Sequence, residues 1–233
     1  MTASLLVLTL LITVFAAWLV RQSINVRPWI AETASGGGMS SVPAAVTAPR
    51  VGLVVFLAVV TSVFALTLSA YMMRMAATPA WEFLPNAGLA WINTAVLLLA
   101  SVALHTALGA SRRGQPKLMW AALAVGGGCT LAFMAGQFLL WRQLNGAGFF
   151  LATHPAGAFF VLMSTLHALH LAGGLYVLGR AVLRSSRGRA PARLRESIAL
   201  CAVYWHYLLF VWLVLFGALF VGALPLYELC RSF

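Results

Sequence analysis

Residues His154–Gly179 read HPAGAFFVLMSTLHALHLAGGLYVLG, an apolar run with two histidines near its middle. The run is long and apolar enough for a membrane helix, which needs about 20 mostly apolar residues. Residues three and four apart share a helix face, so Ser164, His167, His170 and Gly174 form one stripe of small and polar side chains. Polar groups inside a membrane are costly unless partnered. The stripe therefore predicts either a ligand site or a packing contact.

The composition of the whole chain is that of a membrane protein. Its 233 residues are 62% hydrophobic and only 8% charged, whereas soluble domains usually carry about 25% charged residues. The formal net charge of +11 is distributed between the apolar segments and forms no single patch. This distribution is typical of loops at a membrane surface and excludes a nucleic-acid partner.

Six segments are predicted to span the membrane as helices, because each is close to the required length. Only helices satisfy their own backbone in lipid without closing into a barrel, so the expected fold is an all-α integral membrane bundle. The first segment has no basic residues before its apolar run, and we interpret it as a retained helix and not a signal peptide. The six segments are Ala3–Val20, Val51–Met73, Gly88–Ala110, Leu118–Leu140, Ala156–Leu183 and Ser197–Leu224.

The composition changes along the chain and indicates four parts. Residues 1–21 are an N-terminal transmembrane helix, and residues 22–49 are a connector rich in Gly, Ser and Pro that is expected to be flexible. Residues 50–224 form a five-helix bundle, and residues 225–233 are a short tail.

The basic residues predict the orientation. Positive residues stay on the cytoplasmic side of a membrane, and here twelve of the fifteen fall on one side of the predicted helices. Both termini are therefore expected on the outer face of the membrane, which agrees with an even number of helices. The twelve are Arg21, Arg27, Arg50, Arg112, Arg113, Lys117, Arg180, Arg184, Arg187, Arg189, Arg193 and Arg195, and the other three are Arg74, Arg142 and Arg231.

Three histidines are candidate ligands. Together with His206 from the next helix, His167 and His170 have the chemistry for a metal site or an axial haem pair. The alternative is that they hydrogen-bond to one another, to Ser or Thr, or to Gln137. No Cys, Asp or Glu lies nearby in sequence to complete a metal shell. The pattern therefore favours packing, with no metal, cofactor or catalytic residue on this chain.

The acidic residues argue against a proton carrier. The chain has no Asp, and none of its four Glu lies at mid-membrane depth, whereas proton pumps need intramembrane carboxylates. Asn93 and Gln137 are polar residues in apolar segments, and interhelical hydrogen bonds of about 0.6–2 kcal/mol explain them. A small membrane carrier that uses the face of His167, His170 and Gln137 is an alternative of another class.

Two of these stretches carry a resemblance to a known family. The sequences FFVLMSTLHALHLAGG (Phe159–Gly174) and YWHYLLFVWLVLF (Tyr204–Phe216) resemble the most characteristic stretches of subunit III of haem–copper cytochrome c oxidases. The resemblance covers roughly residues 50–222, as five helices in the family's order. Further matches are Arg50-Val-Gly52, Asn93-Thr94 and Gly136-Gln137-x-x-x-Trp141.

The resemblance implies a non-catalytic accessory subunit of a bacterial terminal oxidase in aerobic respiratory electron transport. Such a subunit packs on catalytic subunit I, which holds the haem and copper, and lies beside other oxidase subunits. It binds phospholipid, stabilises the catalytic subunit and supports proton uptake while the complex reduces oxygen. By motif position, Arg50 would contact a lipid phosphate and His206 would line the lipid-bearing region. The implied structural polar residues are Asn93, Gln137, His167 and His170.

Two departures from the family pattern qualify this expectation. The family's Arg-x-Gly helix commonly contains a Glu, and here Val60 or a neighbour takes that place, so a proton role that depends on this Glu does not transfer. Larger members have two helices before the five-helix block and short quinol-oxidase types have none, whereas this chain has one. A subunit III-like protein of a nitric oxide reductase complex is the nearest alternative.

Overall fold

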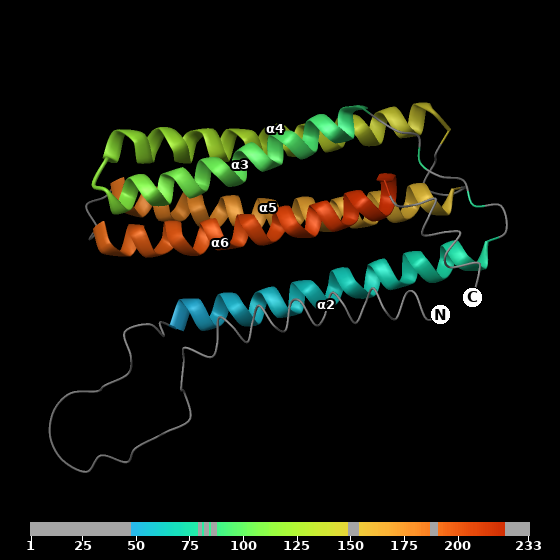
Figure 1. Cartoon of the computed structure of the whole chain (residues 1–233), viewed down its shortest axis with the longest axis horizontal. Helices are drawn as coiled ribbons and strands as arrows, with labels where there is room; N and C mark the ends of the chain where they lie inside the picture. Colours follow the sequence, from blue (N-terminus) through green and yellow to red (C-terminus); the bar gives the residue numbers. More distant parts are fainter. Residues whose placement is uncertain are drawn as a thin grey trace, which may run out of the picture. The chain divides into compact units, whose positions relative to one another are not determined.

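The computed structural model describes residues 48–78, 81, 84, 88–148, 154–186 and 191–221, which are almost entirely helical (Figure 1). All five of the α helices within these residues are long and apolar enough to cross a membrane. They are α2 (Ala48–Ala77), α3 (Gly88–Arg112), α4 (Pro116–Gly146), α5 (Pro155–Ser186) and α6 (Pro191–Phe216), and the π-helical turn η1 (Gly217–Val221) continues α6.

Proline marks the start of most of these helices. Helices α4, α5 and α6 begin on Pro116, Pro155 and Pro191, and Pro49 is the second residue of α2. Proline suits the first turn because its fixed φ matches the helix and its missing N–H would have no intrahelical acceptor there. Between α3 and α4, Gly114 adopts a φ of 68°. This left-handed conformation favours glycine and lets the chain reverse within a short turn.

The chain divides into two compact units, with the boundary between Ser69 and Ala70 inside α2. In the described part of the first unit, residues 48–69, hydroxyl groups bond to the carbonyls of their own helix. Thr61 Oγ1 donates to Leu57 O at 2.8 Å, and Ser62 Oγ donates to Ala58 O at 3.0 Å. Such bonds satisfy hydroxyl groups along an apolar helix.

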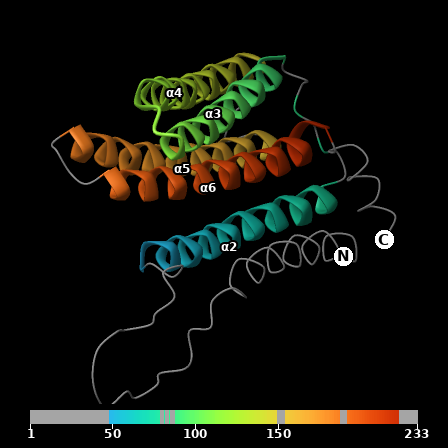
Figure 2. The same cartoon turned by 60° about the vertical axis from the view of Figure 1, so that its left-hand side comes forward.

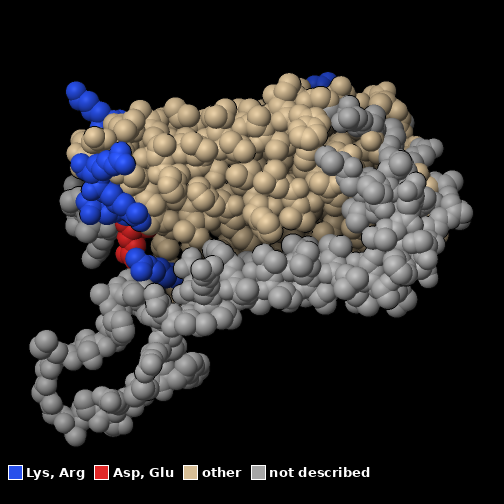
Figure 3. All heavy atoms as spheres, in the orientation of Figure 1, with Lys and Arg blue, Asp and Glu red and all other residues tan. Residues whose placement is uncertain are grey.

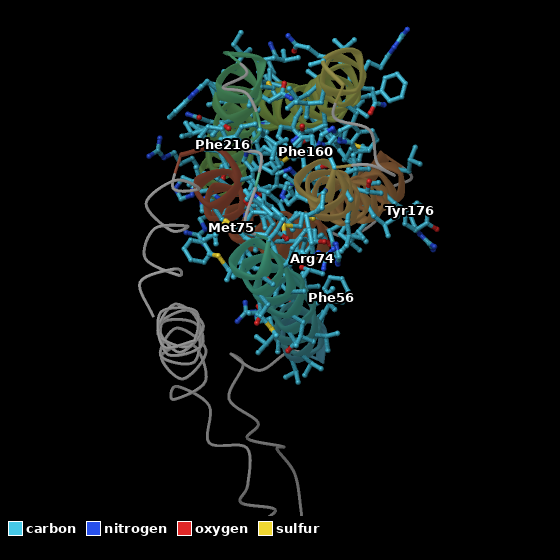
Figure 4. The ribbon with its side chains drawn as sticks, turned by 90° about the vertical axis from the view of Figure 1, so that its right-hand side faces the viewer. Phe56, Arg74, Met75, Phe160, Tyr176 and Phe216 are labelled. Atoms are coloured by element: carbon cyan, nitrogen blue, oxygen red, sulfur yellow. The ribbon has the colours of Figure 1, made fainter. Side chains whose placement is uncertain are left out.

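The second unit contains α3–α6, arranged as two antiparallel hairpins (Figures 1 and 2). Helix α3 packs on α4 and α6, and α6 also packs on α5. The interior is aromatic and aliphatic, and Phe160 and Phe216 are buried there. Tyr176 of α5 points away from the bundle and is 63% exposed (Figure 4). Many exposed side chains are large and apolar, as expected for a surface that faces lipid or other membrane proteins.

The prediction of an all-α membrane protein is confirmed for the five described helices. The predicted first helix at residues 3–20 and the tail at residues 225–233 lie outside the described residues, as does most of the connector. Several ends differ from the prediction. Helix α2 already begins at Ala48 within the predicted connector, and α4 continues to Gly146, beyond Leu140. Helix α6 begins at Pro191, and its α-helical part ends at Phe216.

Basic residues gather at one end of the α3–α6 bundle. Arg112 and Arg113 end α3, Lys117 lies in the first turn of α4, and Arg195 lies near the start of α6. Because the helices alternate in direction, these termini meet at the same end, where Figure 3 shows Lys and Arg gathered. Arg142 lies near the other end of α4. The helices therefore carry the charge asymmetry that the sequence predicted.

Candidate functional site

The centre of the bundle is built around two tryptophans of α6. Trp205 and Trp212 are fully buried, and each indole N–H reaches a threonine on another helix. Trp205 Nε1 donates to Thr130 Oγ1 of α4 at 2.9 Å, and Trp212 Nε1 donates to Thr94 Oγ1 of α3 at 3.0 Å. Helix α6 is thereby fixed in rotation against both α3 and α4, because a tryptophan N–H in an apolar interior needs an acceptor.

His167 lies in the same layer and is completely buried. Its Nε2–H donates to the Leu208 carbonyl of α6 at 3.0 Å. Its ring lies 5.6 Å from the ring of Phe133 and 5.3 Å from that of Trp212, measured between centroids. His167 thus joins α5 to the backbone of α6 inside an aromatic cage.

His170, one turn further along α5, has a different environment. It is only partly buried, and its Nδ1–H donates to Leu166 O of its own helix at 2.6 Å. Its backbone carbonyl accepts a hydrogen bond of 2.9 Å from the hydroxyl of Tyr204 on α6. The imidazole of His170 therefore bonds within α5, and the tie to α6 runs through its backbone.

His206 does not join the other two histidines. It lies on the α3 side of α6, where its Nδ1 shares a hydrogen bond of 2.7 Å with Ser101 Oγ. The ring of His105 stacks against it, with centroids 5.5 Å apart and an angle of 24° between the planes. Positions 206 and 208 differ by about 200° around a helix with 3.6 residues per turn. The Leu208 carbonyl that His167 contacts therefore lies on nearly the opposite face of α6 from His206.

The metal or haem grouping of His167, His170 and His206 that we considered from the sequence is thus not formed. Within the residues that the structure describes, no three His, Cys, Asp or Glu side chains lie close enough to hold a metal ion. The polar stripe of α5 contacts neighbouring helices instead. Ser164 Oγ accepts a hydrogen bond of 2.8 Å from Trp141 Nε1 of α4 and donates to Phe160 O at 2.6 Å.

Asn93 and Gln137 lie in the interior between helices, 3% and 1% exposed. The side chain of Asn93 on α3 covers the backbone of α4 at Gly136, where a Cβ atom would lie 2.7 Å from Asn93 Cγ. In the described part of the chain, Asn93 Nδ2 and both amide atoms of Gln137 lack a hydrogen-bond partner. Both residues are buried in the bundle, but the interhelical hydrogen bonds expected from the sequence are not made by Asn93 Nδ2 or by the Gln137 amide within the described residues. Only Asn93 lies against a glycine of the neighbouring helix.

Arg50 lies in the first turn of α2, and its side chain is exposed. It belongs to the first unit, whereas the polar residues described above belong to the second. Its guanidinium therefore lies near the start of a membrane-capable helix.

Sequence reasoning did not single out His105. The available signal was its spacing, because His105 follows Ser101 by four residues on an apolar helix and so shares its face.

These features define a polytopic α-helical membrane protein whose interior histidines and tryptophans join neighbouring helices. No protein-family model matches the chain. Curated relatives do: cytochrome c oxidase subunit 3 of Thermostichus vulcanus is 27% identical over 183 residues, which cover 73% of this chain and 85% of the relative. The corresponding protein of Synechocystis is 25% identical over 170 residues, 71% of this chain and 72% of the relative. A probable cytochrome c oxidase subunit 3 of Mycobacterium tuberculosis is 31% identical over 91 residues, 39% of this chain and 44% of the relative. These similarities support the cytochrome c oxidase subunit III family for this chain.

Proposed function

We propose that this chain is a non-catalytic accessory subunit of a bacterial haem–copper terminal oxidase in the inner membrane. The observation that carries the proposal is the similarity to named cytochrome c oxidase subunits over most of their length. In this role the chain packs on catalytic subunit I, beside other oxidase subunits, and the partner holds the haem and copper. Further support comes from His167 and His170, whose ring nitrogens bond to backbone carbonyls.

The proposal includes an orientation. The basic ends of α3, α4 and α6 lie together, and basic residues favour the cytoplasmic side. That end of the bundle is therefore assigned to the cytoplasm, and both chain termini to the outer face. In this role the chain would stabilise the catalytic subunit and support its proton uptake through direct contacts with that subunit. The single acid in the described spans, Glu196, lies near the start of α6 and not at mid-membrane depth.

Purification of the full-length chain tests the proposal. An affinity tag on the chain, in mild detergent extracts of its native membranes, is expected to retain a haem-bearing subunit in constant ratio. The chain alone is expected to give no pyridine haemochrome spectrum. Stoichiometric haem in the isolated chain contradicts the non-catalytic role. Retention of a nitric oxide reductase in place of an oxidase would support the nearest alternative.

Arg50 is the proposed contact for a phospholipid phosphate, because a guanidinium binds phosphate oxygens in a bidentate manner. Arg50→Ala is expected to lower the phospholipid that remains with the purified complex, as measured by mass spectrometry. Arg74→Ala is the matched control, because Arg74 is also exposed and lies in the last turn of the same helix. Equal lipid content in the two variants would contradict the assignment.

A further inference from the structure

A pair of histidines lies on the outer surface of the bundle where α3 meets α6. His105 of α3 and His206 of α6 are both exposed, and their rings stack on each other. The buried hydroxyl of Ser101 forms a hydrogen bond with His206. The two rings come from different helices and occupy one patch. We call the patch the imidazole face and define it by Leu98, Val102 and His105 of α3 together with His206, Phe210 and Leu213 of α6.

The imidazole face lies well inside the membrane-capable spans. His105 lies seven residues before Arg112, the end of α3, and His206 lies twelve residues after Leu194, the start of its span. At a rise of 1.5 Å per residue these separations are about 10 Å and 18 Å. The hydrocarbon core is about 30 Å thick. Both histidines therefore lie inside their spans, and the lipid-lining role that the family resemblance implied for His206 stays a prediction.

The imidazole nitrogens differ in their hydrogen bonding from other exposed polar groups of the bundle. Exposed Thr106 and Thr165 donate to carbonyls of their own helices, at 2.7 Å to Ala103 O and 2.6 Å to Val161 O. Among the described residues, no hydrogen bond reaches the His105 ring, and His206 uses only Nδ1. Three ring nitrogens are therefore left at a depth where acyl chains offer no hydrogen bonds, which is costly without a protein partner.

The apolar side chains around the pair have the spacing of a helix-packing surface. Leu98, Val102 and His105 recur at four- and three-residue intervals along α3, as do His206, Phe210 and Leu213 along α6. Both stripes are exposed, and they lie side by side because α3 packs on α6. Two such stripes form a surface on which a third helix can pack.

We propose that the imidazole face docks a transmembrane helix of a partner subunit that presents an Asp or Glu side chain to His105 and His206. Intramembrane histidines and acids pair with one another, and a carboxyl group can bond to imidazole nitrogens on both rings. The chain has no Asp, and its four Glu lie at positions 32, 82, 196 and 228, none near the middle of a described span. No acid of the described spans lies beside the pair, and we assign the acid to another chain. The inference rests on the proposed function for the presence of a membrane partner.

Site-specific photo-crosslinking in the intact complex tests the docking. A p-benzoylphenylalanine introduced at Val102 is expected to form an adduct with a transmembrane peptide that contains an Asp or Glu. Adducts with lipid alone, with a second copy of this chain, or with a helix that has no acid would each overturn the proposal.

Substitution of the pair gives an independent measurement. His105→Leu combined with His206→Leu is expected to weaken retention of the crosslinked partner by about 3- to 20-fold, the range of intramembrane hydrogen bonds. His105→Gln with His206→Gln keeps hydrogen-bonding groups and should restore part of the loss. Thr106→Val is the matched control and should have no effect, because this exposed hydroxyl bonds within α3. The Tm of each isolated variant shows whether the chain remains folded. Unchanged retention in a folded double variant contradicts the proposal.

The two proposals fail in different ways. If the chain retains the haem-bearing subunit while position 102 labels only lipid, the docking is wrong and the accessory role stands. If no haem-bearing subunit is retained but position 102 labels an acid-bearing helix, the accessory role is wrong and the docking stands.

Discussion

Replacing Gly174 by alanine should destabilise the bundle by about 1–3 kcal/mol, the usual cost of overpacking a filled interior. A Cβ atom at position 174 of α5 would lie 2.7 Å from Tyr204 Cε1 and 3.0 Å from Trp205 Cη2. Neither ring can move aside easily. Trp205 is fully buried and bonded to Thr130, and the Tyr204 hydroxyl is bonded to the His170 carbonyl. The expected result is a lower Tm for the chain purified in detergent.

Gly173→Ala provides the control for this change. Gly173 is adjacent and exposed, and a Cβ atom there would have no neighbour within 4 Å. Both substitutions improve intrinsic helix propensity by the same amount, about 1 kcal/mol, so any difference between them reports contact with α6. If the two variants unfolded at the same temperature, the close approach of α5 to α6 at this glycine would be wrong.

The helices themselves could be predicted from the sequence because a bilayer imposes one length and one polarity on every span. Their ends could not, because the helix continues after the apolar run stops. Helix α4 extends through Arg142 and Gln143 to Gly146, since a helix that leaves the hydrocarbon can carry polar side chains. The apolar run thus gives the part of the helix in lipid, and the whole helix is longer.

The polar stripe on α5 was also predictable, but not the partner of each residue. The partner of His167 is a backbone carbonyl, that of Leu208. Every residue carries such a group, so no side-chain pattern points to it. The direction of His206 depends on the rotation of α6, which Trp205 and Trp212 set through Thr130 and Thr94. These are contacts between residues far apart in sequence, and spacing along a single helix contains no information about them.

Gly136→Ala should destabilise the contact between α3 and α4, again by about 1–3 kcal/mol. A Cβ atom at this position would lie 2.7 Å from Asn93 Cγ and 2.8 Å from Asn93 Nδ2. Asn93 is buried, so its amide cannot swing into a solvent-exposed position. Gly128→Ala on the same helix is the matched control, because its Cβ would meet nothing within 4 Å. Thermal unfolding of the purified variants measures the difference.

The obstructing group at Gly136 belongs to one side chain, so a second substitution should remove the obstruction. Asn93→Ala deletes the amide and makes room for a methyl group at position 136. The double variant is therefore expected to unfold at a higher temperature than Gly136→Ala alone, and the two free-energy changes should sum to more than that of the double variant. Asn93 Nδ2 has no hydrogen-bond partner among the described residues, so deleting the amide sacrifices no bond from that atom. Strict additivity would instead mean that Gly136 and Asn93 do not touch, and that the α3–α4 contact requires glycine for another reason.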